Sequence, residues 1–287
     1  MIAHVAEAGE DRGRVVVRLG AFAPSSPAAL AASVHVARAF QSEIEAIFIE
    51  DPDAAAALAH ERARILTPAG ARLSALDPAH TGALTHFAHA TQREIATLAR
   101  AAAVTFSGQV VRQDTLTALS AACAERGPWN IIAFAEPVSS PERAAVLNDA
   151  LTRVWGTTAF VAAGSSARWR PGPILVVVED IERLSGLLRA AKRLAAIGGE
   201  DVLLLPAAID DIALDWLESE IALTLGEGSG VTILPRAVPS GRAEPIQAVV
   251  AKFAPRLVLA RHGGLVVPAE KTARALAPLP CPVFIVH

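Results

Sequence analysis

Short apolar runs recur along the chain and alternate with longer segments of helical periodicity. The run Val15, Val16, Val17 lacks the polar alternation of a strand with one wet face. It therefore predicts a strand buried on both faces, as in a parallel sheet. Further strands are predicted at residues 44–49, 131–134 and 159–162, with a weaker one at 106–112.

Helical patterns separate these strands. Ser26 and Pro27 predict the start of a helix, whose inward face carries Leu30, Val34 and Ala37. Another helix is predicted at 116–125. The Ala-rich stretch from 51 to 104 is predicted to be helical, with an interruption at 68–78. Its apolar face is formed by Leu84, Phe87, Thr91, Ile95, Leu98 and Ala102.

The second half repeats this alternation. Strands are predicted at 174–178, 202–205, 231–234, 257–260 and 283–286, and helices at 181–197, 211–225 and 245–253. Runs 128–163 and 256–287 both follow the order strand, polar loop, helix, strand. We therefore predict two domains, 1–164 and 173–287, joined by the linker 165–172, which combines turn-forming residues with charge.

Strands joined by crossover helices lie parallel, so each half is predicted to be a doubly wound α/β sheet with helices on both faces. In such sheets the ligand crevice lies beyond the carboxyl ends of the strands, where the strand order reverses. The loops after the first and fourth strands of each half are therefore the first places to look for a site.

Composition narrows the class of protein. The 287 residues are 52% hydrophobic and 19% charged, and no apolar run is long enough to cross a bilayer. The formal charge of −3 and the scattered basic residues argue against nucleic acid as the main partner. Residues 1–14 resemble neither a signal peptide nor an anchor, so we expect a cytoplasmic protein. Cys123 and Cys281 are expected to be buried thiols rather than a disulfide.

The run VTILPRAVPSGRAEPIQAVVAKFAPRLVLARHGG and the closing PLPCPVFIVH resemble the universal stress protein family. RVVVRL and EIEAIFIEDP resemble the family's first and second strands, so the chain resembles a tandem member. The resemblance implies a five-stranded parallel sheet of order 3-2-1-4-5 in each half. It also implies antiparallel association of the two fifth strands, which makes the chain an intramolecular pseudo-dimer.

Many members of the family bind ATP through a loop after the fourth strand, patterned Gly-x2-Gly-x9-Gly-Ser/Thr, in which backbone amides approach the phosphates. In the first half the corresponding loop, 135–140, has no glycine, and Glu136 and Glu142 would repel a triphosphate. Ser139 or Ser140 is predicted to cap the following helix. Leu19 stands near the place of an aspartate that contacts nucleotide in the family.

In the second half the loop keeps Arg261, His262, Gly263 and Gly264 but lacks the later Gly-Ser/Thr element. Arg261, His262 and Lys271 could meet an anion there, although a tight solvated turn is the favoured interpretation.

Carboxylates stand at the aspartate position of this half. Glu179 follows its first strand, and Asp180 is either a second carboxylate at the site or a helix cap. Glu179, Asp180 and the 261–264 loop are the predicted nucleotide-binding residues.

Two further clusters have simpler interpretations. His86 and His89 share a helix face and could bind a metal with His60 or His80, but nearby arginines favour a solvated face. The acidic segment 210–220 is predicted to be a solvated helix face, with a partner-docking surface as the alternative.

Three functions follow from the family resemblance. The leading hypothesis is a non-catalytic stress-response or regulatory module that acts through a protein partner, with degenerate nucleotide sites and no cofactor. The alternative is an ATP- or adenine-nucleotide-binding protein with a site in the second half and at most slow hydrolysis. The third is binding of another small anionic or adenosine-containing ligand without turnover.

Overall fold

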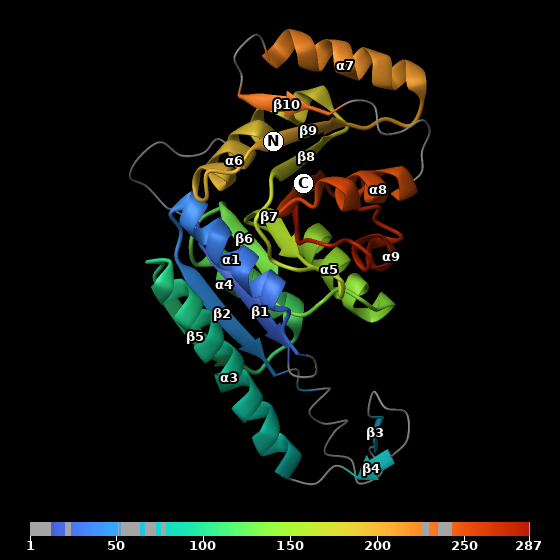
Figure 1. Cartoon of the computed structure of the whole chain (residues 1–287). Coiled ribbons are helices and arrows are strands. Elements are labelled where there is room, and N and C mark those ends of the chain that lie inside the picture. Colours follow the sequence, from blue (N-terminus) through green and yellow to red (C-terminus); the bar gives the residue numbers. More distant parts are fainter. Residues whose placement is uncertain are drawn as a thin grey trace.

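One ten-stranded sheet runs through the whole molecule (Figure 1). The computed structural model describes residues 13–20, 24–50, 52, 64–66, 73–75, 79–225, 230–234 and 243–286. Across the sheet the strand order is β10-β9-β8-β11-β12-β7-β6-β1-β2-β5. In the part of the chain that is described, no helix has the length and apolarity needed to span a bilayer.

Each half contributes five parallel strands. The first half holds β1 (Val15–Gly20), β2 (Ile44–Ile49), β5 (Phe106–Val111), β6 (Asn130–Phe134) and β7 (Thr157–Ala162). The second holds β8 (Ile174–Val178), β9 (Val202–Pro206), β10 (Val231–Ile233), β11 (Leu257–Arg261) and β12 (Val283–Val286). Numbered within each half, both give the order 3-2-1-4-5, which confirms the predicted fold class.

The two halves join through their fifth strands. β12 pairs with β7 antiparallel, and Ile285 lies opposite Phe160 in the register. Both side chains are 0% exposed. The predicted pseudo-dimer is therefore confirmed, and its interface is a continuous part of the sheet core.

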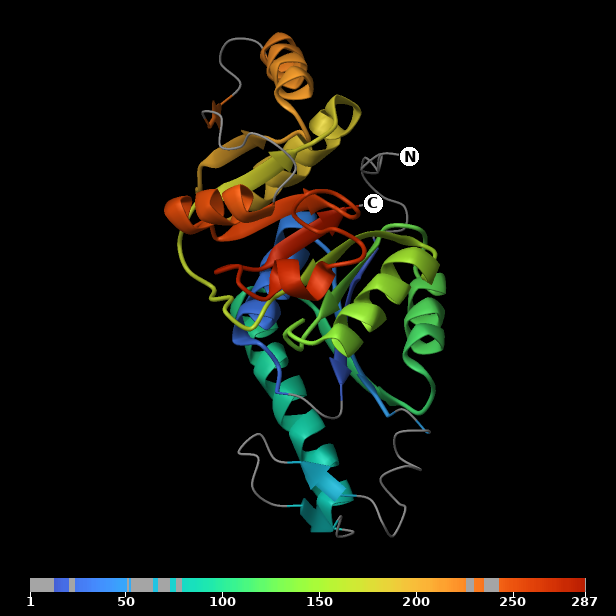
Figure 2. The same ribbon diagram turned by 90° about the vertical axis from the view of Figure 1, so that its right-hand side faces the viewer.

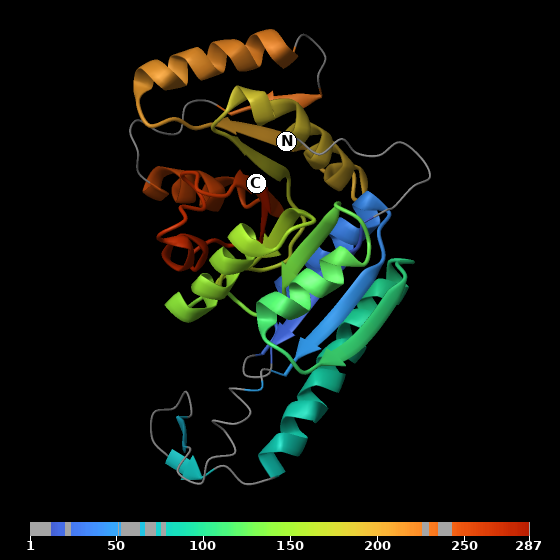
Figure 3. The ribbon, with the colours of Figure 1, turned by 180° about the vertical axis from the view of Figure 1, so that it is seen from behind.

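Helices cover both faces of the sheet. One apolar cluster includes residues of α1 (Pro27–Phe40), α3 (Ala79–Ala101), α6 (Leu184–Ala196) and α7 (Asp211–Leu225). The other includes residues of α4 (Thr115–Ala124), α5 (Pro141–Arg153), α8 (Ala243–Phe253) and α9 (Thr272–Leu276). Figure 1 has α1, α3 and α6 toward the viewer, and Figure 3 shows α4 and α5 from behind. This is the doubly wound arrangement that the alternating sequence pattern predicts.

Several helices begin where capping residues in the sequence predict that they begin. The Ser26 hydroxyl accepts a hydrogen bond from the Ala29 amide and so caps α1. Ser140, one of the two predicted caps, does the same for α5 through the Arg143 amide. The predicted helix at 181–197 begins as a short 3-10 turn (Ile181–Arg183) and continues as α6.

The prediction for residues 51–104 is partly wrong. Residues 64–66 form β3 (Arg64–Leu66), which pairs antiparallel with β4 (Leu73–Ala75). Pro68 and Gly70 between them favour a turn over a continuing helix, so these segments extend and pair. On α3, Thr91 and Ile95 are buried, as the predicted apolar face requires. Leu84 and Phe87 belong to that face, but their side chains lie outside the described residues.

The predicted linker 165–172 packs against the second half. The Ser166 amide donates to the Ala277 carbonyl, and the Arg168 amide donates to the Pro280 carbonyl at 2.8 Å. Ala167 is 4% exposed. The segment is thus held by backbone hydrogen bonds, while the domain boundaries at 164 and 173 stay predictions.

Truncating Phe160 tests the importance of the β7–β12 pair. Phe160→Ala leaves a cavity between the halves, so we expect a loss of about 3–5 kcal/mol in the free energy of unfolding, measured by urea denaturation. Val110→Ala on the edge strand is the control, because that side chain is 46% exposed, and it should change stability by less than about 0.5 kcal/mol. Equal effects of the two substitutions would contradict a buried junction.

Candidate functional site

The glycine loop of the second half closes on itself. It follows β11, and Gly263 takes a left-handed φ of 74° that suits glycine. The Gly263 amide donates to the Val267 carbonyl at 2.9 Å, and the Gly264 amide donates to the Arg261 carbonyl at 3.3 Å. Since a phosphate loop must point its amides at the ligand, these two amides are already used within the turn.

Glu179 lies across this loop. It follows β8, the strand next to β11 in the sheet. One carboxylate oxygen accepts a hydrogen bond from the Leu265 amide at 3.0 Å. The carboxylate also covers Gly264 so closely that a Cβ on that glycine would overlap it. The Glu179 side chain therefore bridges the end of the first strand of this half and the loop after the fourth strand.

The carboxylate of Glu179 is withdrawn from water. Burial raises its pKa above the ordinary value of 4.5, while the hydrogen bond from Leu265 and the positive charge of Arg261 oppose that rise. The Nε of Arg261 is buried and makes no hydrogen bond within the described residues. Arg261 acts on Glu179 as a nearby positive charge.

The other predicted site residues, Asp180, His262 and Lys271, do not take part in the contact between Glu179 and the loop. Asp180 accepts from the Glu182 amide at 2.9 Å and lies 3.7 Å from the Arg183 guanidinium, so it caps the 3-10 turn. The His262 amide donates to the Val286 carbonyl of the neighbouring strand, and burial lowers the pKa of its ring. Lys271 is exposed at the start of α9.

The first half has the same contact between a glutamate and a glycine, but the strands that carry the two residues are exchanged. Glu136 follows β6, is 5% exposed, and accepts a hydrogen bond from the Gly20 amide at the end of β1. It also forms an ion pair of 2.7 Å with Arg18, whose guanidinium lies over the Phe134 ring at 5.6 Å. A Cβ on Gly20 would overlap the Glu136 carboxylate.

Both halves therefore use one glutamate to join the ends of the first and fourth strands. In the first half the glutamate follows the fourth strand and covers a glycine of the first, Gly20. In the second half it follows the first strand and covers a glycine after the fourth, Gly264. Both glutamates lie where the strand order reverses, which is the usual ligand crevice of such sheets.

Sequence reasoning missed Arg18. Arg18 is a charged residue within the apolar run RVVVRL. A charge in a buried strand needs a partner, so this position could have indicated an ion pair. Leu19, by contrast, is 2% exposed and belongs to the core.

The histidine cluster is only partly described. His89 is exposed on α3. The side chains of His60, His80 and His86 lie outside the described residues. Where the structure describes side chains, it brings together no group of three or more metal-ligating residues.

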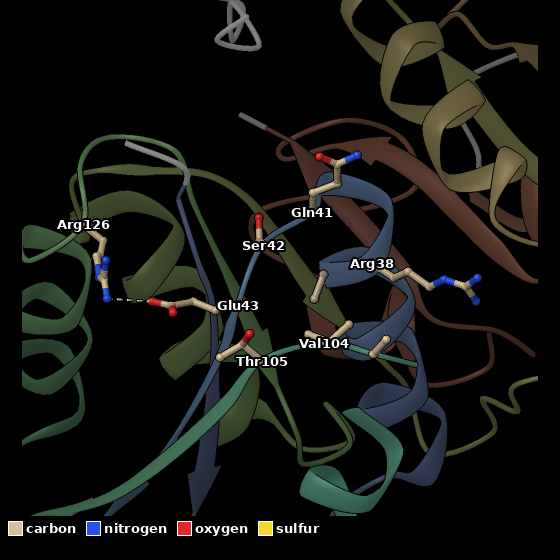
Figure 4. Close-up of a pocket in the computed structure, with 9 residues that line it drawn as sticks. Arg38, Gln41, Ser42, Glu43, Val104, Thr105 and Arg126 are labelled. Carbon is tan, nitrogen blue, oxygen red and sulfur yellow. Dashed lines mark ion pairs between the residues drawn. The ribbon is translucent and has the colours of Figure 1, made fainter. Parts of the chain in front are cut away.

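A separate pocket of about 600 Å³ opens at the amino ends of β2 and β5. Figure 4 shows its lining, including the 3.1 Å ion pair between Arg126 and Glu43. The C-terminal ends of α1 and α3 lead into Gln41 and Ala103, which line it. Helix C-termini carry partial negative charge, so this pocket does not offer the positive helix end that favours phosphate.

No family model and no curated protein matches the chain. Several solved structures do match the chain. A universal stress protein from Archaeoglobus fulgidus DSM 4304 matches with a TM-score of 0.57 at 13% identity, covering 94% of this chain and 95% of that one. A functionally unknown protein from Pseudomonas aeruginosa PAO1 matches with a TM-score of 0.52 at 16% identity, covering 96% and 92%.

The cytoplasmic domain of a prokaryotic cation chloride cotransporter also matches, with a TM-score of 0.55 at 9% identity, covering 96% of this chain and 95% of that one. At such identities the likeness concerns the fold. The chain has the fold of tandem universal stress proteins over nearly its full length.

The raised pKa of Glu179 gives a pH dependence with a defined sign. The folded protein keeps the Glu179 proton to a higher pH than the unfolded chain does. Its contribution to stability is therefore present below 4.5 and is lost as the pH rises through the raised pKa. Glu179→Gln has no titrating carboxyl group, so its stability relative to wild type should rise as the pH increases from 4.5 through the raised pKa. Urea unfolding at several pH values measures this difference.

Glu142→Gln is the matched control for that experiment. A hydrogen bond with the Ser140 hydroxyl lowers the pKa of Glu142 below 4.5. The stability of wild type relative to this variant should therefore increase as the pH rises from the lowered pKa to 4.5. If the two variants show the same trend with pH, Glu179 is not buried as described.

The two cysteines should be inert in the folded protein. Burial raises the pKa of Cys123 and of Cys281 to about 12, so neither forms an appreciable amount of thiolate at neutral pH. A thiol reagent such as Ellman's should label the protein only after denaturation. Rapid labelling of the native protein would contradict this assignment.

Proposed function

We propose that this protein is a non-catalytic binding or regulatory module of the universal stress protein type, acting in the cytoplasm through a protein partner and without a bound nucleotide. One observation carries the proposal. In both halves a glutamate of the chain, Glu136 or Glu179, bridges the ends of the first and fourth strands, the region where such sheets usually bind a ligand.

Electrostatics supports the proposal. A nucleotide phosphate placed in either crevice would meet a carboxylate. Two like charges about 4 Å apart repel by about 4 kcal/mol at the effective dielectric constant of about 20 found near protein surfaces. Removing the carboxylate from the crevice would break the bond to the Gly20 or Leu265 amide. In the first half it would also leave Arg18 without its ion-pair partner Glu136.

The alternative function, adenine-nucleotide binding in the second half, has one observation in its favour. A side chain at Gly263 would meet nothing within 4 Å, so the tip of the loop is open. Arg261 adds a positive charge beside it. Nucleotide binding there, and any slow hydrolysis, would require Glu179 to leave Gly264.

Calorimetric titration distinguishes the two functions. We expect ATP, ADP and AMP to show no saturable binding with a Kd below about 1 mM. Mass spectrometry of the denatured protein should release no nucleotide. The reason is that a carboxylate, Glu136 or Glu179, lies between the ends of the first and fourth strands in each half.

Tight ATP binding would contradict the proposed function. If that binding is lost in Arg261→Ala and kept in Arg274→Ala, a control at an exposed arginine of α9, the alternative function is established instead.

A further inference from the structure

Helix α7 has two apolar faces. Leu214, Leu217 and Ile221 are at most 2% exposed and fix the helix to the sheet. Ile212, Trp216 and Leu223 are 82%, 55% and 78% exposed. At 100° per residue these three lie within about 40° of one another, on the side of the helix opposite the buried face. We call Ile212, Trp216, Ser219 and Leu223 the outer stripe.

The outer stripe has the spacing of a helix-docking seam. Its positions follow one another at intervals of four, three and four residues, which is the heptad spacing of helices that pack side by side. Single exposed apolar residues are common on protein surfaces. Three large ones in line, on the solvent side of a helix already anchored to the sheet, form a continuous contact surface.

The stripe is open to a partner. α7 lies at the far end of the molecule from α3, outside the sheet (Figures 1 and 2). Ile209, just before the helix, is 68% exposed and extends the apolar surface.

The charge beside the stripe selects the partner. Asp215 and Glu220 border it on opposite sides. Residues 194–225 contain no lysine, arginine or histidine. A second copy of this chain would bring acidic borders against acidic borders, which is unfavourable. A helix with an apolar seam and flanking lysines or arginines would be complementary in both shape and charge.

We infer that the outer stripe of α7 docks a basic amphipathic helix of a partner protein. This inference rests on the proposed function, since it supplies the surface through which the module acts. Trp216 is the central anchor, because large aromatic side chains dominate such contacts. Asp215 and Glu220 set the preference for a basic partner and the salt dependence of binding.

The test uses the full-length protein and a synthetic helical peptide of about 20 residues, with leucines at heptad a and d positions and lysines beside them. Calorimetry should show saturable binding that weakens with salt. The same peptide with glutamate in place of lysine should not bind.

Substitutions locate the site. Ile212→Ser combined with Trp216→Ser should weaken binding of the basic peptide by at least about tenfold. Asp215→Lys combined with Glu220→Lys should do the same and should admit the acidic peptide. Trp155→Ser is the control, because Trp155 is 87% exposed and lies between α5 and β7, away from α7. Circular dichroism and thermal melts confirm that all variants are folded.

Three outcomes overturn the inference: no binding of the basic peptide, binding unaffected by the Ile212 and Trp216 substitutions, or a dimer in sedimentation that those substitutions dissociate. The last outcome would assign the stripe to a second copy of the chain. These results are independent of the nucleotide titration. Loss of peptide binding leaves the closed crevices in place, and ATP binding would refute the proposed function whatever the peptide does.

Discussion

The antiparallel pairing of β7 with β12 determines the layout of the molecule. Because these strands run in opposite directions, all the strands of one half point opposite to those of the other. The two crevices therefore open at opposite edges of one sheet and cannot share a ligand. The same pairing brings α1 and α6, the first full helices of the two halves, together on one face.

Within that layout, each half has a glutamate between the ends of its first and fourth strands, and the two glutamates differ in their electrostatic surroundings. Glu136 has a full ion pair with Arg18 and a backbone amide at Gly20. Glu179 accepts a hydrogen bond from the Leu265 amide and lies near the positive charge of Arg261. These two interactions lower its pKa by less than burial raises it, so the pKa is raised overall. A buried carboxylate is tolerated only when such partners replace water. The first half is therefore closed by a salt bridge, and the second by a hydrogen bond to the loop.

Most of the fold was predictable because buried parallel strands are encoded as contiguous apolar runs. The predicted bounds of β2, β8 and β12 agree with the structure to the residue. The short strands β3 and β4 were missed, since three-residue segments carry too little periodicity and depend on pairing with each other.

The site was less predictable, since its contacts cross the sheet. Glu179 and Gly264 are 85 residues apart in sequence and meet only because β8 and β11 are neighbours. Glu179 and Asp180 are adjacent, yet only Glu179 contacts the loop, because successive side chains at the end of a strand point to opposite sides. No local pattern could show which of the two carboxylates faced the crevice.

A crevice closed by the chain itself changes what can regulate the protein. A nucleotide shifts a conformational equilibrium only as far as its affinity differs between the two states. If the proposed function is correct, the nucleotide would first have to displace Glu136 or Glu179, so that difference in affinity works against binding. Under the proposed function, regulation then passes to surfaces that remain open, and α7 offers one that is apolar, acidic and anchored to the rigid sheet through Leu217 and Ile221. A docking helix mounted on that core needs no rearrangement to bind, so its affinity follows partner concentration and salt instead of nucleotide level.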